Sequence, residues 1–291
     1  MSRRTHNRHR IAVICRAATG LPHLTCLRWA TEGLIDRYQP VPDADLPGQR
    51  AFEARLVLSL VDALRHEQVE GALLGFTASE PSREGLTLTL HPAMADRVLA
   101  AALPRRDMLY GGLRGVPGLR LTGSPGRWWL RGLLDGARVR LRHPDPFWRP
   151  VLPQGAPDLV HVWRQSPRHP HGSELPAHRP LRHGQDWLLS RALRRPRLVN
   201  GAGAAHGWAN TYAHGSRGIT IEWCCAMPAS DMARLLVRSG LTAEAEGLPP
   251  TKRPQRENWS AYGLLELGEA VLTVRQGHCA ERATASLRAS S

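Results

Sequence analysis

The sequence predicts an α+β protein with an N-terminal pair of helices, a helix-plus-sheet middle and a small C-terminal α+β domain. Apolar residues recur every four positions between Gln49 and Glu70, which is the spacing of an amphipathic helix. Leu alternates with Thr over Leu86–Leu90, as in a strand with one buried face. The apolar runs Ala261–Leu267 and Ala270–Val274 predict a hairpin. We therefore expect the C-terminal domain to place its helices on one face of a mostly antiparallel sheet.

The elements before the long helix are short. Residues 11–35 predict two helices around Gly20. The segment Tyr38–Gln49 contains three prolines, so we expect a linker and a domain boundary there.

Glycine and proline also set the ends of the elements that follow the long helix. Gly71 ends that helix, and the apolar run Ala72–Thr77 predicts a strand. Pro92 suits the first position of a helix that continues to Leu103, before Pro104 stops it. Gln185–Arg195 and Pro228–Ser239 predict further helices, and Ile219–Trp223 predicts a strand.

These elements divide the chain into six segments. We expect a basic arm over 1–10, a helix-turn-helix-like pair over 11–38, a helix-plus-sheet domain over 49–143, a Pro/His/Arg-rich connection over 144–186, a C-terminal α+β domain over 187–279 and a tail over 280–291.

One strand and the helix after it recur. Gly-Leu-Thr-Leu at 85–88 is followed by Ala-Met-Ala-Asp at 93–96, and Gly-Ile-Thr-Ile at 218–221 is followed by Ala-Ser-Asp-Met at 229–232, each leading into a helix of similar length. An internal duplication would give this match, and so would any two unrelated strand-helix units.

The charge of the chain is concentrated in one third of it. Residues 104–197 hold 18 Arg against six Asp and Glu, together with five of the nine tryptophans. Arginine beside tryptophan is typical of proteins that bind a polyanion carrying flat bases. The single lysine against 38 arginines also indicates a GC-rich genome, so a non-enzymatic scaffold with genome-biased arginine is an alternative.

Two elements of the basic region are candidate contacts. In the strand Ala137–Arg142, alternation puts Arg138, Arg140 and Arg142 on one face, about 6.7 Å apart, where only anions or nearby carboxylates relieve their repulsion. The helix Gln185–Arg195 repeats the theme with Arg191 and Arg194. We expect these five arginines to contact phosphates. The alternative for this helix is an amphipathic helix packed through its leucines, with its arginines in solvent.

The N-terminal pair resembles the helix-turn-helix segment of bacterial DNA-binding proteins. The similarity covers about 25 residues, namely Gly20, Leu21 and Pro22 at the turn, then Thr25 and Arg28 early in the second helix, with apolar residues on both sides. The resemblance implies that His23, Thr25 and Arg28 read the major groove, while Leu21, Cys26 and Trp29 pack between the helices. Arg16 stands where a small residue normally lets the helices approach.

The arm before this pair is too polar to fold alone. Its arginines, Arg3 and Arg4 among them, are candidates to lie along phosphates or in a minor groove. A solubilising tail is the alternative.

Signals for metal or catalysis are weaker. Five histidines between 161 and 183 have no zinc-site spacing and no cysteine near them, so we expect neither a metal nor a cofactor. His206 and His214 lie in a glycine-rich stretch before Cys224, and a thiol nucleophile would need one of these imidazoles as its base. These residues carry the alternative of an enzyme acting on nucleic acid or on a phosphorylated substrate.

The remaining composition bounds the setting. No run approaches the roughly 20 apolar residues of a membrane span. Five scattered cysteines favour free thiols and a cytoplasmic location. The sequence therefore predicts a nucleic-acid-binding protein, with duplex DNA favoured, acting as a regulator or as an accessory protein of replication or of a mobile element. Its oligomeric state is left open.

Overall fold

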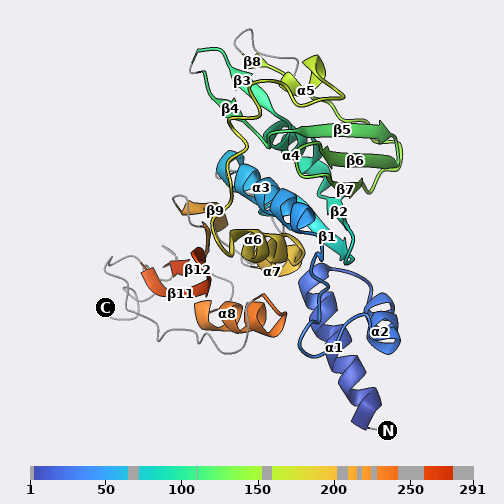
Figure 1. Ribbon diagram of the computed structural model, residues 1–291. Helices are drawn as coiled ribbons and strands as arrows, with labels where there is room; N and C mark the ends of the chain where they lie inside the picture. Colours follow the sequence, from blue (N-terminus) through green and yellow to red (C-terminus); the bar gives the residue numbers. More distant parts are fainter. Residues whose placement is uncertain are drawn as a thin grey trace, which may run out of the picture.

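The computed structural model describes residues 3–64, 72–109, 111–152, 159–201, 209–214, 218–223, 228–241 and 259–277. Helices α3 and α6 cross in the middle, and a sheet lies to either side of them (Figure 1). The α+β class is confirmed.

The first half begins with three helices and continues into a mixed sheet. Its elements are α1 (Arg3–Thr19), α2 (His23–Glu32), α3 (Pro47–Ala63), β1 (Phe76–Pro81), β2 (Leu86–Leu90), the 3₁₀ turn η1 (Pro92–Met94), α4 (Ala95–Ala102), β3 (Arg105–Asp107), β4 (Leu113–Arg114), β5 (Leu119–Ser124), β6 (Arg127–Gly132) and β7 (Ala137–Arg142).

The second half begins in the proline-rich segment. Its elements are β8 (Leu159–Val160), α5 (Val162–Gln165), α6 (Gln185–Leu193), α7 (Pro196–Gly201), β9 (Ala209–His214), β10 (Gly218–Trp223), α8 (Ala229–Arg238), β11 (Trp259–Leu267) and β12 (Ala270–Gly277). The strands form sheets in the orders β1-β2-β7-β6-β5, β9-β10-β12-β11 and β4-β3-β8.

The core explains why these elements form where they do. Pro47 supplies the fixed backbone angle of a first helical turn, and α3 then buries Phe52, Leu56 and Leu60 completely. Strand β2 alternates buried Leu with half-buried Thr, as its sequence predicts. The five-stranded sheet, the four-stranded sheet and the helices between them share one hydrophobic cluster.

Four predicted boundaries differ from the structure. The expected arm is part of α1, because packing of the helix beyond Arg10 extends it through the polar residues. The expected linker is buried over Pro40–Ala44, where it packs against α6. The strand predicted at Ala72–Thr77 begins only at Phe76, after a turn at Gly75. Helix α3 ends at Ala63, and residues 65–71 lie outside the described part.

The two strand-helix units noted in the sequence occupy equivalent places in the two larger sheets. In each, two strands and a helix are followed by further strands, and the second strand lies parallel to the last, β2 to β7 and β10 to β12. Leu86 of β2 pairs with Val139 of β7, and Ile219 of β10 pairs with Leu272 of β12. The units therefore share this parallel pairing and its register, although the first also contains β3, β4 and β5, which have no counterpart in the described part of the second.

The helices that precede the two units match as well. In α3, Gly48-Gln49 follows the first residue, Pro47, and α6 is preceded by Gly184 and starts with Gln185. A Cβ atom on Gly48 would meet the carbonyl oxygen of Asp135, in the β6–β7 turn. One on Gly184 would meet that of Leu267, in the β11–β12 turn. Each helix thus starts directly against the last hairpin of its own unit, and the two helices pack on each other.

We expect Gly48→Ala to lower the free energy of unfolding by roughly 1–3 kcal/mol, because the added methyl group overpacks the hairpin turn. Urea unfolding monitored by circular dichroism measures this. Gly172→Ala is the control, since nothing lies within 4 Å of its Cβ position, and it should change the value by less than about 0.5 kcal/mol. A neutral Gly48→Ala would refute the close approach.

Candidate nucleic-acid interface

The three arginines of β7 line one face of the five-stranded sheet. Burial alternates along the strand, so that Ala137, Val139 and Leu141 are buried while Arg138 and Arg142 are exposed and Arg140 is half-buried. The predicted division of this strand into a core face and an arginine face is confirmed.

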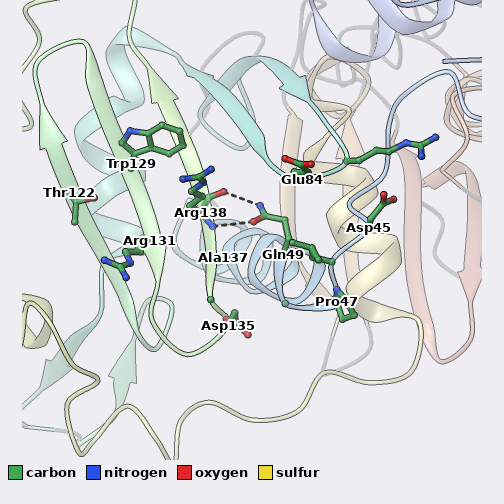
Figure 2. A pocket seen from close by; sticks show the side chains of 14 residues that line it. Asp45, Pro47, Gln49, Glu84, Thr122, Trp129, Arg131, Asp135, Ala137 and Arg138 are labelled. Carbon is green, nitrogen blue, oxygen red and sulfur yellow. Dashed lines mark hydrogen bonds between the residues drawn. The ribbon is translucent and has the colours of Figure 1, made fainter. Parts of the chain in front are cut away.

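Strand β6 adds to the same face. Trp129 is the cross-strand partner of Arg140, and Arg131 is the partner of Arg138. The guanidinium carbons of Arg138 and Arg140 lie 5.4 and 6.0 Å from the centre of the Trp129 ring. Such cation–π contacts attract both guanidinium groups to the indole ring. Figure 2 shows Trp129, Arg131 and Arg138 on adjacent strands.

We call these residues the basic sheet face: Arg127, Trp129, Arg131, Arg138, Arg140 and Arg142. Within the described strands, Glu80 of β1 is the carboxylate that reaches it, 3.0 Å from Arg142. Both partners of this pair are about half exposed, at 51% and 41%. An exposed pair of this kind contributes little and leaves the face strongly positive.

A different arginine marks where the face ends. Arg120 of β5 is buried, and its guanidinium binds both carboxylate oxygens of Glu174 at 2.8 and 2.9 Å. Burial opposes ionisation of Glu174, but hydrogen bonds from Arg120 and two backbone amides keep its pKa below the usual range. Arg120 is therefore structural, and the loop that carries Glu174 covers this edge.

A cavity of about 1050 Å³ opens beside the face, between the N-terminal end of α3 and strands β6 and β7 (Figure 2). Its lining includes three arginines and three carboxylates, Asp45, Glu84 and Asp135. The opposite charges nearly balance. Trp129, Arg131 and Arg138 belong both to this lining and to the basic sheet face, so the three carboxylates reduce the net positive charge at this end of the face.

A glutamine fixes the backbone of β7. The side-chain amide of Gln49 donates to the carbonyl of Arg138 and accepts from its N–H, both at 3.1 Å. Its second amide proton goes to Glu53, at 2.8 Å. The arginine row is thus connected to the buried interior by one side chain.

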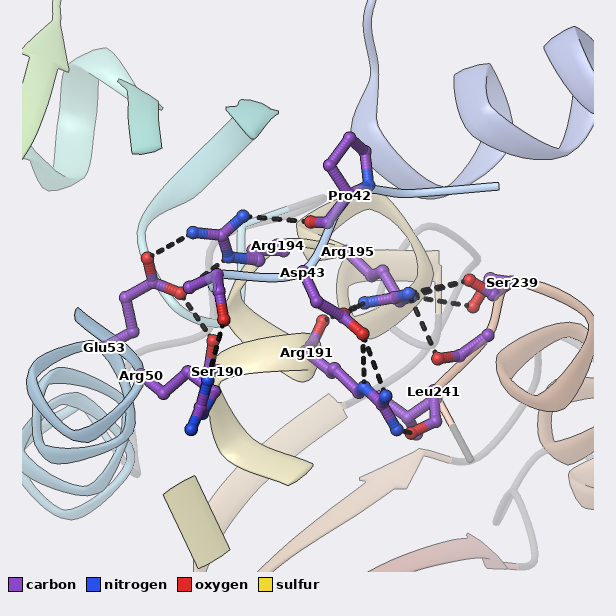
Figure 3. Close-up of polar contacts among 12 residues, drawn as sticks. Pro42, Asp43, Arg50, Glu53, Ser190, Arg191, Arg194, Arg195, Ser239 and Leu241 are labelled. Atoms are coloured by element: carbon purple, nitrogen blue, oxygen red, sulfur yellow. Dashed lines mark hydrogen bonds and ion pairs between the residues drawn. The ribbon is translucent and has the colours of Figure 1, made fainter. Parts of the chain in front are cut away.

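Arg194 and Glu53 form a fully buried ion pair, so the expected phosphate contact at Arg194 is wrong. Two nitrogens of Arg194 bind the two oxygens of Glu53 at 2.7 and 2.8 Å, and both side chains have 0% exposure. The carbonyl oxygen of Pro42 accepts another of its protons (Figure 3), and those of Ser82 and Gly85 accept the rest. Every donor of this guanidinium is occupied, which leaves none for a ligand.

Arg191 is also structural. Its guanidinium binds Asp43 through two nitrogens at 2.8 and 3.0 Å and donates to the carbonyl of Leu241 (Figure 3). Neighbouring Arg195 is buried and binds Ser239, and burial lowers its pKa to about 9, so that it is still charged at neutral pH. The end of α6 therefore ties the first unit to α8, and the predicted interface role of Arg191 is not supported.

The N-terminal helices form the predicted pair and project from the body (Figure 1). Cys26 and Leu21 are buried between them, with Trp29 packed alongside, as expected. The turn at Gly20 has φ of 80°. Arg16 is exposed and does not separate the helices, because Ala12 and Cys15 make the contact.

The proposed reading residues differ in exposure. Arg28 is exposed, and so is Leu24 one turn before it, at 78%. Thr25 is half-buried. His23 is half-buried and stacks on His9, with ring centres 5.7 Å apart. Arg28 is thus the member of the three that extends freely from α2.

Several predicted residues lie wholly or in part outside the described residues. Arg3 and Arg4 lie in the first turn of α1, and His214 lies in β9, but their side chains are outside the described part. His206 and Cys224 lie outside the described residues entirely.

Among residues that the structure does describe, no three His, Cys, Asp or Glu side chains converge as a metal site would require. No described helix is long and apolar enough to cross a membrane.

Sequence reasoning missed the arginines of β6. Arg127, Trp129 and Arg131 alternate just as the residues of β7 do, so a hairpin prediction around Gly132–Gly136 would have placed them on the same face. Sequence reasoning also could not separate exposed arginines from buried ones.

Comparison of the chain with protein-family models, with curated proteins and with solved structures finds no match.

Glu53→Ala should lower the free energy of unfolding by roughly 3–5 kcal/mol, because it leaves the Arg194 charge buried without its partner. Glu80→Ala removes the same kind of group from an exposed pair and should cost less than about 1 kcal/mol. Urea unfolding of both variants gives the comparison. Equal costs would mean that the buried pair is not what holds α3 to α6.

Proposed function

We propose that the chain binds nucleic acid and contacts the phosphate backbone with its basic sheet face. The observation that supports this most is the excess of five arginines over one weakly coupled carboxylate on the outward positions of β1, β2, β6 and β7. A regularly spaced row of guanidinium groups matches a regularly spaced row of phosphates.

Helix α1 supports the same partner class. Its sequence contains five arginines and no acidic residue, and no carboxylate lies in its first turn, where the helix dipole favours one. Like charges one turn apart destabilise a helix. A bound polyanion would offset this cost.

Duplex DNA is the nucleic acid that we favour. Helix α2 exposes Arg28 and Leu24 on a short rigid pair that stands away from the sheets, in the manner of a helix that enters a groove. Phosphate contacts by the sheet and base contacts by α2 would then divide affinity from specificity.

A cytoplasmic location is part of the proposal. Cys15 and Cys26 are free thiols buried between α1 and α2. Thiols that persist in this state are typical of a reducing compartment.

Replacement of Arg138, Arg140 and Arg142 by Gln should flatten the dependence of log affinity on log salt by about two to three units, since each phosphate contact contributes about 0.9. Fluorescence anisotropy with a labelled duplex at several salt concentrations measures the slope. Single-stranded DNA and RNA probes rank the nucleic acids.

The control for this experiment is the triple variant Arg164→Gln, Arg168→Gln, Arg238→Gln. It removes the same charge from exposed positions outside the basic sheet face. The proposal fails if both triple variants lose the same slope, or if the unsubstituted chain binds none of the probes.

Arg28→Ala tests the groove contact. We expect it to cost roughly 1–3 kcal/mol on a preferred duplex selected from random sequences, and much less on random duplex. Loss of equal size on every duplex would make Arg28 a phosphate contact, and no loss on any would remove α2 from the interface.

A further inference from the structure

A second cavity, of about 990 Å³, lies between the C-terminal half of α3, the β3–β4 pair and the segment before α6. Its charged lining is one-sided. One carboxylate, Asp62, faces five arginines, Arg55, Arg105, Arg114, Arg179 and Arg182. We call this the arginine cavity, and none of its arginines belongs to the basic sheet face.

The arginines differ in how well their charges are compensated. Arg55 binds Asp135 at 2.6 Å, and Asp135 is nearly buried. Arg114 is 62% exposed and lies 3.5 Å from Asp107. Arg105 has no carboxylate within ion-pair distance in the part of the chain that the structure describes. Arg182 lies 3.7 Å from Glu269, and Arg179 is exposed to solvent. Arg105 is therefore the half-buried arginine of this lining whose charge has no described carboxylate beside it.

Arg105 is also placed against a like charge. It is the cross-strand partner of Arg114 in the β3–β4 pair, and it is half-buried. Like charges directly opposite each other on neighbouring strands destabilise a sheet. Burial, and then the charge of Arg114, lower the pKa of Arg105. This arrangement costs stability in the free protein, and an anion bound between the two guanidinium groups would recover it.

The shape and the remaining lining indicate the kind of anion. Leu58, Val116 and Leu181 contribute apolar wall beside the arginines. The volume is within the roughly 300–1,000 Å³ that small-molecule sites occupy. A phosphate group has enough oxygens and charge to engage two or more guanidinium forks, whereas a carboxylate engages one.

We propose that the arginine cavity binds a small organic phosphate, with Arg105 and Arg114 holding the phosphate group and the apolar wall holding the rest of the molecule. This site is separate from the proposed nucleic-acid interface and does not depend on it.

Inorganic pyrophosphate is the probe, and its binding to the full chain is measured by isothermal titration calorimetry and by thermal unfolding at constant ionic strength. We expect it to bind and to raise the unfolding temperature more than sodium chloride does. Arg105→Gln should weaken pyrophosphate binding about tenfold, because it removes a charge-assisted hydrogen-bond donor. Without ligand it should unfold at a higher temperature than the unsubstituted chain.

Arg106→Gln is the matched control. Its side chain is exposed and lies on the other face of the same strand, outside the lining of the cavity. It should leave pyrophosphate binding unchanged, as should the triple variant of Arg138, Arg140 and Arg142. Absence of binding, or equal loss in the Arg105 and Arg106 variants, overturns the proposal.

Duplex DNA binding by the same variants distinguishes the two sources of phosphate. We expect Arg105→Gln to bind duplex as the unsubstituted chain does. If it loses duplex binding while pyrophosphate has no effect on the unsubstituted chain, the cavity contacts a nucleic-acid backbone and the small-molecule assignment is wrong.

Discussion

The buried pair between Glu53 and Arg194 determines how the two halves of this chain meet. Glu53 lies on α3 of the first unit, and Arg194 follows α6 of the second. Two unpaired charges in such an interior would be costly, and the pair is tolerable only because every hydrogen-bonding position is occupied. The Ser190 hydroxyl donates a hydrogen bond to the Glu53 carboxylate at 2.6 Å, and backbone carbonyls accept the remaining protons of the Arg194 guanidinium. A complete set of partners permits one relative placement of α3 and α6.

The Glu53 carboxylate is also connected to the proposed interface, through Gln49. The same carboxylate accepts from Gln49, and Gln49 in turn holds the backbone of Arg138. The arginines of β7 are therefore presented by a strand whose position is fixed from the interior. A rigid row loses less conformational entropy on meeting a row of phosphates than a flexible arm does. The arginines proposed to contact phosphate in the sheet face and in the arginine cavity accordingly lie on strands and not on loops.

Two kinds of arginine result from one biased composition. Those at the end of α6 hold the units together and are unavailable to ligands, whereas those of β6 and β7 face outward with little compensation. Periodicity predicted the β7 members of the second kind, because strand alternation alone assigns a face, and the same alternation in β6 was missed. It could not predict the first kind, because Arg191 and Arg194 acquire their partners from Asp43 and Glu53, more than 130 positions away.

Local pattern was enough to determine the class of this protein, its helical N-terminal pair, the two faces of β7 and the recurrence of a strand-helix unit, since each depends on neighbours within a few residues. Tertiary structure alone decided that α1 continues through the polar arm, that Pro40–Ala44 is buried, and that Arg105 opposes Arg114. These features depend on which distant segments come to lie together. Burial and charge pairing are properties of that assembly, and no spacing along the chain encodes them.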